Sequence, residues 1–155
     1  MTEKTTPDNV VIKGDWIAGE APLEALDVYG VGAITPGMLL ERTATGTVQP
    51  HSGAAGLVAP KMWAVEAALF EGGDIDTDYD TDGETVLYKI CYPGAHVYAF
   101  LAAGNDTVSA NVLLASNGDG TLRVSNTNPV ARALEDVDND PGTGGAAVRI
   151  KAEVL

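Results

Sequence analysis

Turn-forming residues interrupt this chain so often that long helices have little room. From residue 85 onward, Gly, Pro, Asn and Asp cluster about every 8–12 residues. Two examples are Pro93-Gly94 and Asn117-Gly118-Asp119-Gly120. The whole chain of 155 residues contains 18 glycines and 8 prolines. Such spacing is typical of short strands joined by tight turns, so the sequence predicts an all-β barrel or sandwich.

Alternation of apolar and polar residues supports the same fold class. In residues 148–154, four apolar side chains alternate with Arg149, Lys151 and Glu153, which places the two kinds on opposite faces of one strand. In residues 85–92, the same alternation places Tyr92 on the face of Tyr88. The strands predicted in this way are 10–13, 26–29, 38–42, 46–49, 85–92, 96–102, 108–116, 121–124, 129–135 and 148–154. Residues 129–135 also fit a helix, although a strand is favoured.

One segment has the spacing of a helix. Pro60 suits the first helical turn, apolar residues from Met62 to Leu69 recur at helical intervals, and Gly72-Gly73 would end the helix. Because the segment is short, the same residues also fit a strand. Both alternatives stay open at this point.

The charge of the chain argues against nucleic acid as a partner. The formal net charge is −13, from 22 acidic and 9 basic residues, and such a surface repels phosphate backbones. An acidic excess also fits adaptation to high salt, because molar salt screens repulsion between surface carboxylates.

The apolar runs are shorter than the roughly 18 residues that a membrane helix needs. We therefore expect no secretory signal and no membrane contact.

Five aspartates occupy every second position from Asp74 to Asp82, which suggests a calcium site. An EF-hand loop that starts at Asp78 has Asp80, Asp82 and Gly83 in place, but Lys89 stands where the bidentate acid belongs. Alternate side chains of a straight strand also lie roughly 6.6 Å apart, too far to surround one ion. We expect a solvated acidic loop and no cofactor; if Ca²⁺ binds, Asp78, Asp80 and Asp82 are its ligands.

The other residues capable of chemistry are few. Cys91 is the only cysteine, so the chain has neither an intrachain disulfide nor a cysteine-based zinc site, and its apolar neighbours predict a small buried side chain. His51 and His96 have no partner at metal-ligand spacing. Nucleophile elbows and phosphate-binding glycine loops are absent from the sequence. We therefore expect no enzymatic activity.

Taken together, several segments resemble the small capsid decoration (cement) proteins of tailed viruses. The resemblance covers about residues 28 to 155, and its motifs are mostly turns and strand pairs. Asp78, Asp80 and Asp82 depart from the usual pattern and fit a salt-adapted host better. The segments that carry the resemblance are 36–41, 46–52, 74–76 with Tyr79, 83–86, 93–99, 101–104, 118–123, 130–135 and 149–154.

The resemblance implies a small barrel or β-clip-like sandwich with at most one or two short helices. It divides the chain into an extended N-terminal arm, residues 1–20, and a single β-rich decoration domain, residues 21–155. It further implies a homotrimer on the outer surface of the virion, which binds the major capsid protein and stabilises contacts between its subunits. The resemblance also implies assembly in the cytoplasm of a host. An alternative is a cation-dependent surface module, such as a virion fibre or glycan-binding domain.

Six residues are the predicted contacts with the capsid. The arm is prone to form a strand and could add one to a capsid sheet. Turns supply the remaining contacts. The predicted contact residues are Val10, Val11, Ile12 and Trp16 in the arm, and Pro36 and Pro93 in turns.

Overall fold

The computed structural model describes residues 12–13, 24–27, 33–44, 47–53, 61–66, 74–79, 85–104, 108–139 and 146–155, with the backbone alone for the first two ranges. Every regular element in these ranges is a strand, which confirms the predicted all-β class. None of the described residues forms a helix long and apolar enough to span a membrane. The strands are β1 (Ile12–Lys13), β2 (Glu24–Asp27), β3 (Leu39–Arg42), β4 (Val48–Pro50), β5 (Met62–Ala64), β6 (Thr85–Ile90), β7 (His96–Leu101), β8 (Leu113–Ser116), β9 (Leu122–Val124), β10 (Ala131–Ala133) and β11 (Val148–Val154).

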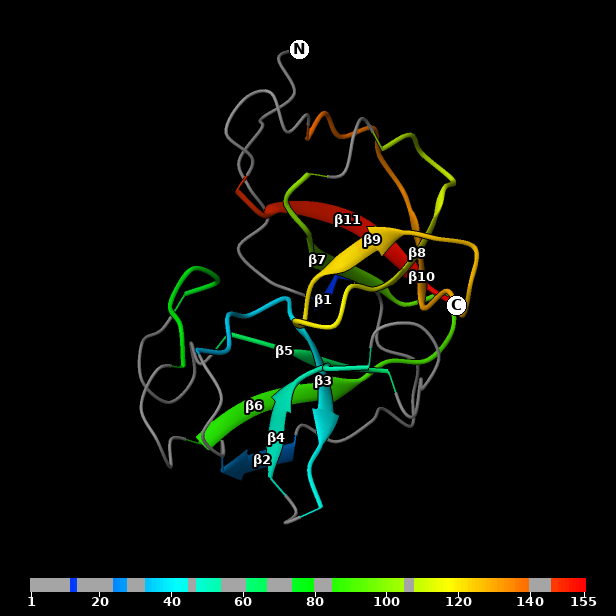
Figure 1. The fold of residues 1–155 in the computed structure, drawn as a ribbon. Coiled ribbons are helices and arrows are strands. Elements are labelled where there is room, and N and C mark those ends of the chain that lie inside the picture. Colours follow the sequence, from blue (N-terminus) through cyan, green and yellow to red (C-terminus); the bar gives the residue numbers. More distant parts are fainter. Residues whose placement is uncertain are drawn as a thin grey trace.

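The strands form two sheets, one above the other in Figure 1. Sheet A has the order β1-β7-β11-β10-β8-β9, and sheet B has the order β2-β6-β5-β3-β4. Sheet A curls into a half-barrel, because β9 returns to β7 through a parallel pairing of Leu101 with Leu122. The N–H of Ala102 donates to the carbonyl of Leu122 at 2.7 Å and reinforces this closure.

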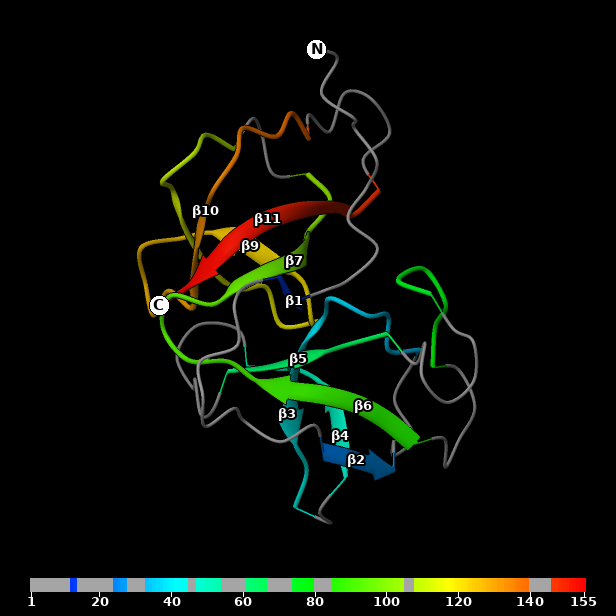
Figure 2. The same cartoon turned by 180° about the vertical axis from the view of Figure 1, so that it is seen from behind.

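The connection from β6 to β7 carries the chain from sheet B to sheet A. It passes close to the end of β11, as Figure 2 shows from behind. There the N–H of Gly94 donates to the carbonyl of Val154 at 2.8 Å, and the N–H of Val154 donates to the carbonyl of Ala95 at 2.8 Å. The crossover is therefore held to the central strand of sheet A by backbone hydrogen bonds.

The main hydrophobic core lies inside the curl of sheet A and extends down to sheet B. The alternation in β7 and β11 places Val97, Ala99, Leu101 and Ile150 in this core, each at most 2% exposed. Leu39, Trp63 and Cys91 come from the sheet B side and pack against the same cluster. A shared core of this kind makes the two sheets one packed unit in the described part of the chain.

The opposite face of sheet B has a separate core. Tyr88 and Met62 are its largest strand residues, and Ile34 and Tyr79 approach from outside the sheet through an isolated bridge. The hydroxyl of Tyr79 donates to the carbonyl of Val65 at 2.6 Å, so its polar end is satisfied inside the protein. Strand β5 and the middle of β6 are thus buried on both faces.

The helix considered for the segment after Pro60 is wrong for the described residues 61–66, and the alternative strand is confirmed. Met62–Ala64 is strand β5, which pairs with β3 and β6 in the middle of sheet B. All three of its residues are buried. A strand buried on both faces is a short continuous apolar run, so its sequence lacks the period of two that identifies a strand.

Other predicted strands are confirmed in shortened form. The 108–116 segment contributes only β8, while Val108 forms an isolated bridge with Val137. The 129–135 segment contributes β10, and the 10–13 segment contributes β1, which pairs Ile12 with Val97 of sheet A.

Candidate functional site

The most exposed large apolar side chain in the described part of the chain is Tyr92, at 63%. It opens the crossover turn, defined here as Tyr92, Pro93 and Gly94, and all three residues are exposed. The N–H of Ala95 donates to the carbonyl of Tyr92 at 3.1 Å and closes the turn. Gly94 has φ +91° and open space around its α-carbon, so the turn needs its glycine for the backbone conformation alone.

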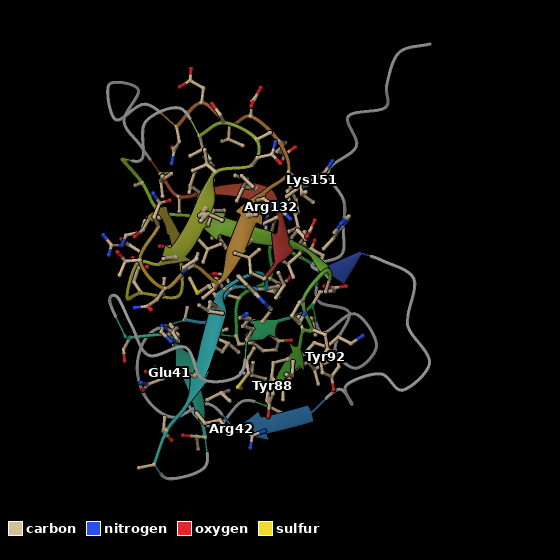
Figure 3. All side chains as sticks on the ribbon, turned by 90° about the vertical axis from the view of Figure 1, so that its right-hand side faces the viewer. Glu41, Arg42, Tyr88, Tyr92, Arg132 and Lys151 are labelled. Carbon is tan, nitrogen blue, oxygen red and sulfur yellow. The ribbon has the colours of Figure 1, made fainter. Side chains whose placement is uncertain are left out.

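Tyr92 does not continue the inward face of β6 as the alternation predicts. Strand β6 ends at Ile90, and the chain turns before it reaches Tyr92. Figure 3 shows Tyr92 below Lys151 and Arg132, on the opposite side of the view from Glu41. An aromatic ring held on a fixed turn loses little conformational entropy when a partner covers it.

Pro93 and Pro36 differ in their surroundings. Pro93 is exposed in the crossover turn, whereas Pro36 is buried and its carbonyl accepts a hydrogen bond from Nη1 of Arg149 at 2.8 Å. Pro93 therefore belongs to the candidate contact surface, whereas Pro36 contributes to stability through its hydrogen bond with Arg149. Val10, Val11 and Trp16 lie outside the described residues, and of Ile12 the structure gives the backbone pairing with Val97.

Arg149 is a residue whose importance the sequence did not indicate. Alternation places it on the outer face of β11, yet its side chain is only 12% exposed. The guanidinium donates to the carbonyls of Pro36 and Ile75, and it pairs with the carboxylate of Asp76 at 3.0 Å. These partners lie on the segments around sheet B, so one side chain of sheet A holds two loops in place.

The described part of the aspartate run, residues 74–79, stabilises its loop through local hydrogen bonds. One carboxylate oxygen of Asp74 accepts from the N–H of Asp76 at 3.0 Å and from the hydroxyl of Thr77 at 2.9 Å. The hydrogen bond from Thr77, followed by that from Asp76, keeps the pKa of Asp74 below its ordinary value. Asp78 is exposed, whereas Asp80 and Asp82 lie outside the described residues.

Within the ranges that the structure describes, no three histidine, cysteine or acidic side chains gather as metal ligands. Asp76, which the run places at the centre of the first three aspartates, is paired with Arg149. The described part of the run therefore acts through hydrogen bonds and one ion pair.

His51 joins the two sheets from a buried position. Its Nδ1 lies 2.8 Å from the hydroxyl of Ser116 at the end of β8, and its Nε2 lies 3.9 Å from the carboxylate of Glu41 on β3. Both His51 and Ser116 are almost fully buried, at 4% and 3% exposure. The hydroxyl of Ser116 also accepts from the N–H of Gly118. This arrangement ties strands together and leaves the hydroxyl no open approach for a substrate.

Glu41 completes this polar group. Burial alone would raise its pKa, but hydrogen bonds from Ser52 and Gln49 and the nearby His51 bring the pKa below its ordinary value. Nε2 of Gln49 donates to Glu41 at 2.6 Å across the β3–β4 pair. His96, the second histidine, is exposed at the start of β7 and takes no part in the group.

The prediction that Cys91 is a small buried side chain is confirmed. Its exposure is 7%, and it packs in the main core. Burial raises the pKa of the thiol to about 12, only partly offset by the charge of Lys89. The thiolate that nucleophilic chemistry needs is therefore scarce at neutral pH.

Comparison with known proteins gives no relative from which a function could be transferred. No protein-family model matches the chain, and no curated protein matches its sequence significantly.

Proposed function

We propose that the chain is a non-enzymatic structural protein of a virion, which binds the outer surface of a tailed-virus capsid and stabilises contacts between major capsid protein subunits. The proposal starts from the resemblance in the sequence. The structural observation that carries it is the crossover turn, where Tyr92 and Pro93 are exposed on a fixed backbone. Exposed aromatic residues on rigid supports are typical centres of protein–protein contacts.

The scaffold behind the turn suits a protein that bears load. The crossover is hydrogen-bonded to Val154, and Arg149 links sheet A to the loops around sheet B. A rigid support transmits force to its partner without first unfolding locally. This is the property that a protein needs to reinforce a shell.

The net charge of −13 is consistent with an outward-facing position. An acidic surface is repelled by packaged DNA and by other copies at short range, except where specific contacts form. We propose a homotrimer, in which three copies of the turn contact neighbouring capsid subunits. A standard contact buries about 800 Å² per partner, and linking three modest contacts raises the overall affinity greatly.

No group of metal ligands among the described residues favours a cation-dependent binding module as a second function. Its predicted ligands are Asp78, Asp80 and Asp82, whereas the neighbouring Asp74 and Asp76 form hydrogen bonds and an ion pair within the fold. Of the proposed ligands, Asp78 alone is described, and it is exposed.

The test is binding of the purified chain to viral heads that lack it. We expect dense, saturable binding, with hundreds of copies per head in electron-microscopy maps. Tyr92→Ser should weaken binding at least about tenfold, the loss expected when a contact centre is truncated. Leu134→Ser is the matched control, because Leu134 is exposed at 37% directly after β10, outside the crossover turn, and the change should leave binding unchanged.

A chain without residues 1–20 tests the contribution of the arm. We expect it to fold and to lose most of its affinity for heads. Failure of the intact chain to bind heads, or a low copy number on particles that carry it, would contradict the proposal. Equal binding by the Tyr92→Ser and Leu134→Ser variants would show that the capsid contact does not include the crossover turn.

A further inference from the structure

The indole N–H of Trp63 is a buried donor that finds no acceptor among the described residues. Trp63 is fully buried in β5, the central strand of sheet B. Buried N–H groups almost always have a partner in native proteins, since an unpaired one retains its full desolvation penalty. The exception indicates an acceptor that belongs to neither sheet.

A buried cation is the cross-strand neighbour of this donor. Trp63 pairs with Lys89 of β6 on one side and with Leu39 of β3 on the other. Residues paired directly across antiparallel strands project from the same face of the sheet, so these three side chains form one row. Lys89 is only 7% exposed, which is unusual for a lysine.

The row faces the main core. Leu39 and Trp63 pack there with Cys91, which follows Lys89 by two residues. The charge of Lys89 also acts on Cys91, because it lowers the pKa of a thiol that burial otherwise raises. The direct pairing of Lys89 with Trp63 places the lysine side chain on the side of sheet B on which the indole lies.

We propose that Trp63 and Lys89 form a binding site for one small monovalent anion of the halide class, with chloride as the natural occupant. The indole N–H donates to the ion, Lys89 supplies positive potential, and Leu39 and Cys91 provide apolar surroundings. Lys89 has another interaction within the protein, and the ion is an additional partner. A buried water needs two to four polar partners. Burial of an anion is costly without an opposite charge, and the buried Lys89 supplies that charge beside the indole N–H.

The site gives the effect of salt on this acidic chain a specific component. Screening of surface carboxylates depends on ionic strength and is the same for any monovalent anion. A bound ion instead stabilises the folded state by mass action. Once the ion concentration exceeds the dissociation constant, the free energy of unfolding rises with the logarithm of that concentration. Even a weak site would be filled at molar chloride. The inference is independent of the proposed role on a capsid.

The first experiment compares thermal unfolding of the full chain in potassium chloride and potassium gluconate at equal ionic strength. We expect the melting temperature to be about 2–4 °C higher in chloride, a shift typical of one modest ligand on a chain of this size. Trp63→Phe should abolish the difference between the two salts but retain the effect of ionic strength. Met62→Leu, on the opposite face of the same strand, should lower the melting temperature and keep the difference.

The second experiment detects the ion itself and does not depend on the folding of the Trp63 variant. In a Trp16→Phe chain, Trp63 is the only tryptophan, and iodide at its N–H should quench its fluorescence along a saturable curve. Chloride should compete with iodide, whereas gluconate should not. Lys89→Met should weaken the saturable quenching at least about fivefold.

Three results would overturn the proposal. One is equal stability of the wild-type chain in chloride and gluconate. Another is a chloride effect that persists undiminished in Trp63→Phe, which would assign it to general salt effects. The third is iodide quenching that is linear and unaffected by chloride, which would leave the indole N–H with a water molecule or with no partner.

Discussion

The guanidinium carbon of Arg149 lies 4.2 Å from the centroid of the Phe100 ring, and the two residues are paired across β11 and β7. The guanidinium lies over this ring, and its N–H groups donate to the carbonyls of Pro36 and Ile75. Arg149, on the outer face of sheet A, thereby links this sheet to the segments around sheet B that contain Pro36 and Ile75.

Replacing Arg149 with Met should lower the free energy of unfolding by about 2–4 kcal/mol, because two carbonyl acceptors and the contact with Phe100 are lost together. Arg149→Lys should recover only part of this, since an ammonium cannot reach several acceptors in one plane. Urea denaturation measures the change. Lys151→Met, two residues along the same face, is the control and should change stability by less than about 0.5 kcal/mol; a similar loss in both variants would refute the role given to Arg149.

Gly37→Ala should be far more costly than Gly94→Ala, although both glycines have positive φ, +101° and +91°. A β-carbon at Gly37 would stand 2.7 Å from the carbonyl oxygen of Tyr98 and 2.8 Å from Nη1 of Arg149, whereas one at Gly94 meets nothing within 4 Å. We expect losses of about 3 kcal/mol or more at Gly37 and about 1 kcal/mol at Gly94. Chemical denaturation of the two variants side by side tests this, and equal losses would mean that φ alone decides both.

The Cys91 thiol should resist alkylation in the folded protein at pH 8 and react rapidly once the chain is unfolded. Burial raises its pKa from 9.0 to about 12, so the folded state keeps the proton after the unfolded state has lost it. The stability that the protonated Cys91 thiol contributes is therefore fully present below about pH 9, and it is lost between pH 9 and about 12. Cys91→Ala should remove this alkaline decline. Fast labelling of the folded chain at pH 8 would show that the thiol is accessible.

Ser116→Ala should lower stability by about 1–3 kcal/mol, because it removes a hydrogen-bond partner from the buried imidazole of His51. Ser109→Ala replaces an exposed serine and should have an effect below about 0.5 kcal/mol. Combining Ser116→Ala with His51→Leu should cost less than the sum of the two single changes, since each removes the same interaction. Strict additivity in denaturation experiments would show that the pair is not coupled.

The sequence was most informative where one face of a strand is buried and the other is not. The alternation in β7 and β11 predicted which residues face the core, and Val97, Ala99 and Ile150 are buried as expected. In sheet B, β5 and the middle of β6 are buried on both faces, so the period of two is lost there. Met62–Ala64 therefore fitted a helix as well as a strand.

The contacts that fasten the fold could not be predicted from local patterns. Arg149 and Pro36 are 113 positions apart, and His51 and Ser116 are 65 positions apart. Alternation places Arg149 and Lys151 on the same face and does not distinguish them, although one is nearly buried and the other is exposed. Likewise, only the tertiary structure shows that the Trp63 donor is unsatisfied beside a buried lysine.

Strand β11 lies between β7 and β10 in sheet A, yet it follows both of them in the chain. During synthesis, β7 and β10 therefore leave the ribosome with a gap between them that only residues 148–154 can fill. The half-barrel can form only after this segment has emerged, and contacts so distant in sequence form slowly. A ribosome stalled before residue 148 should thus carry a chain whose sheet edges are open to chaperones and to neighbouring nascent chains.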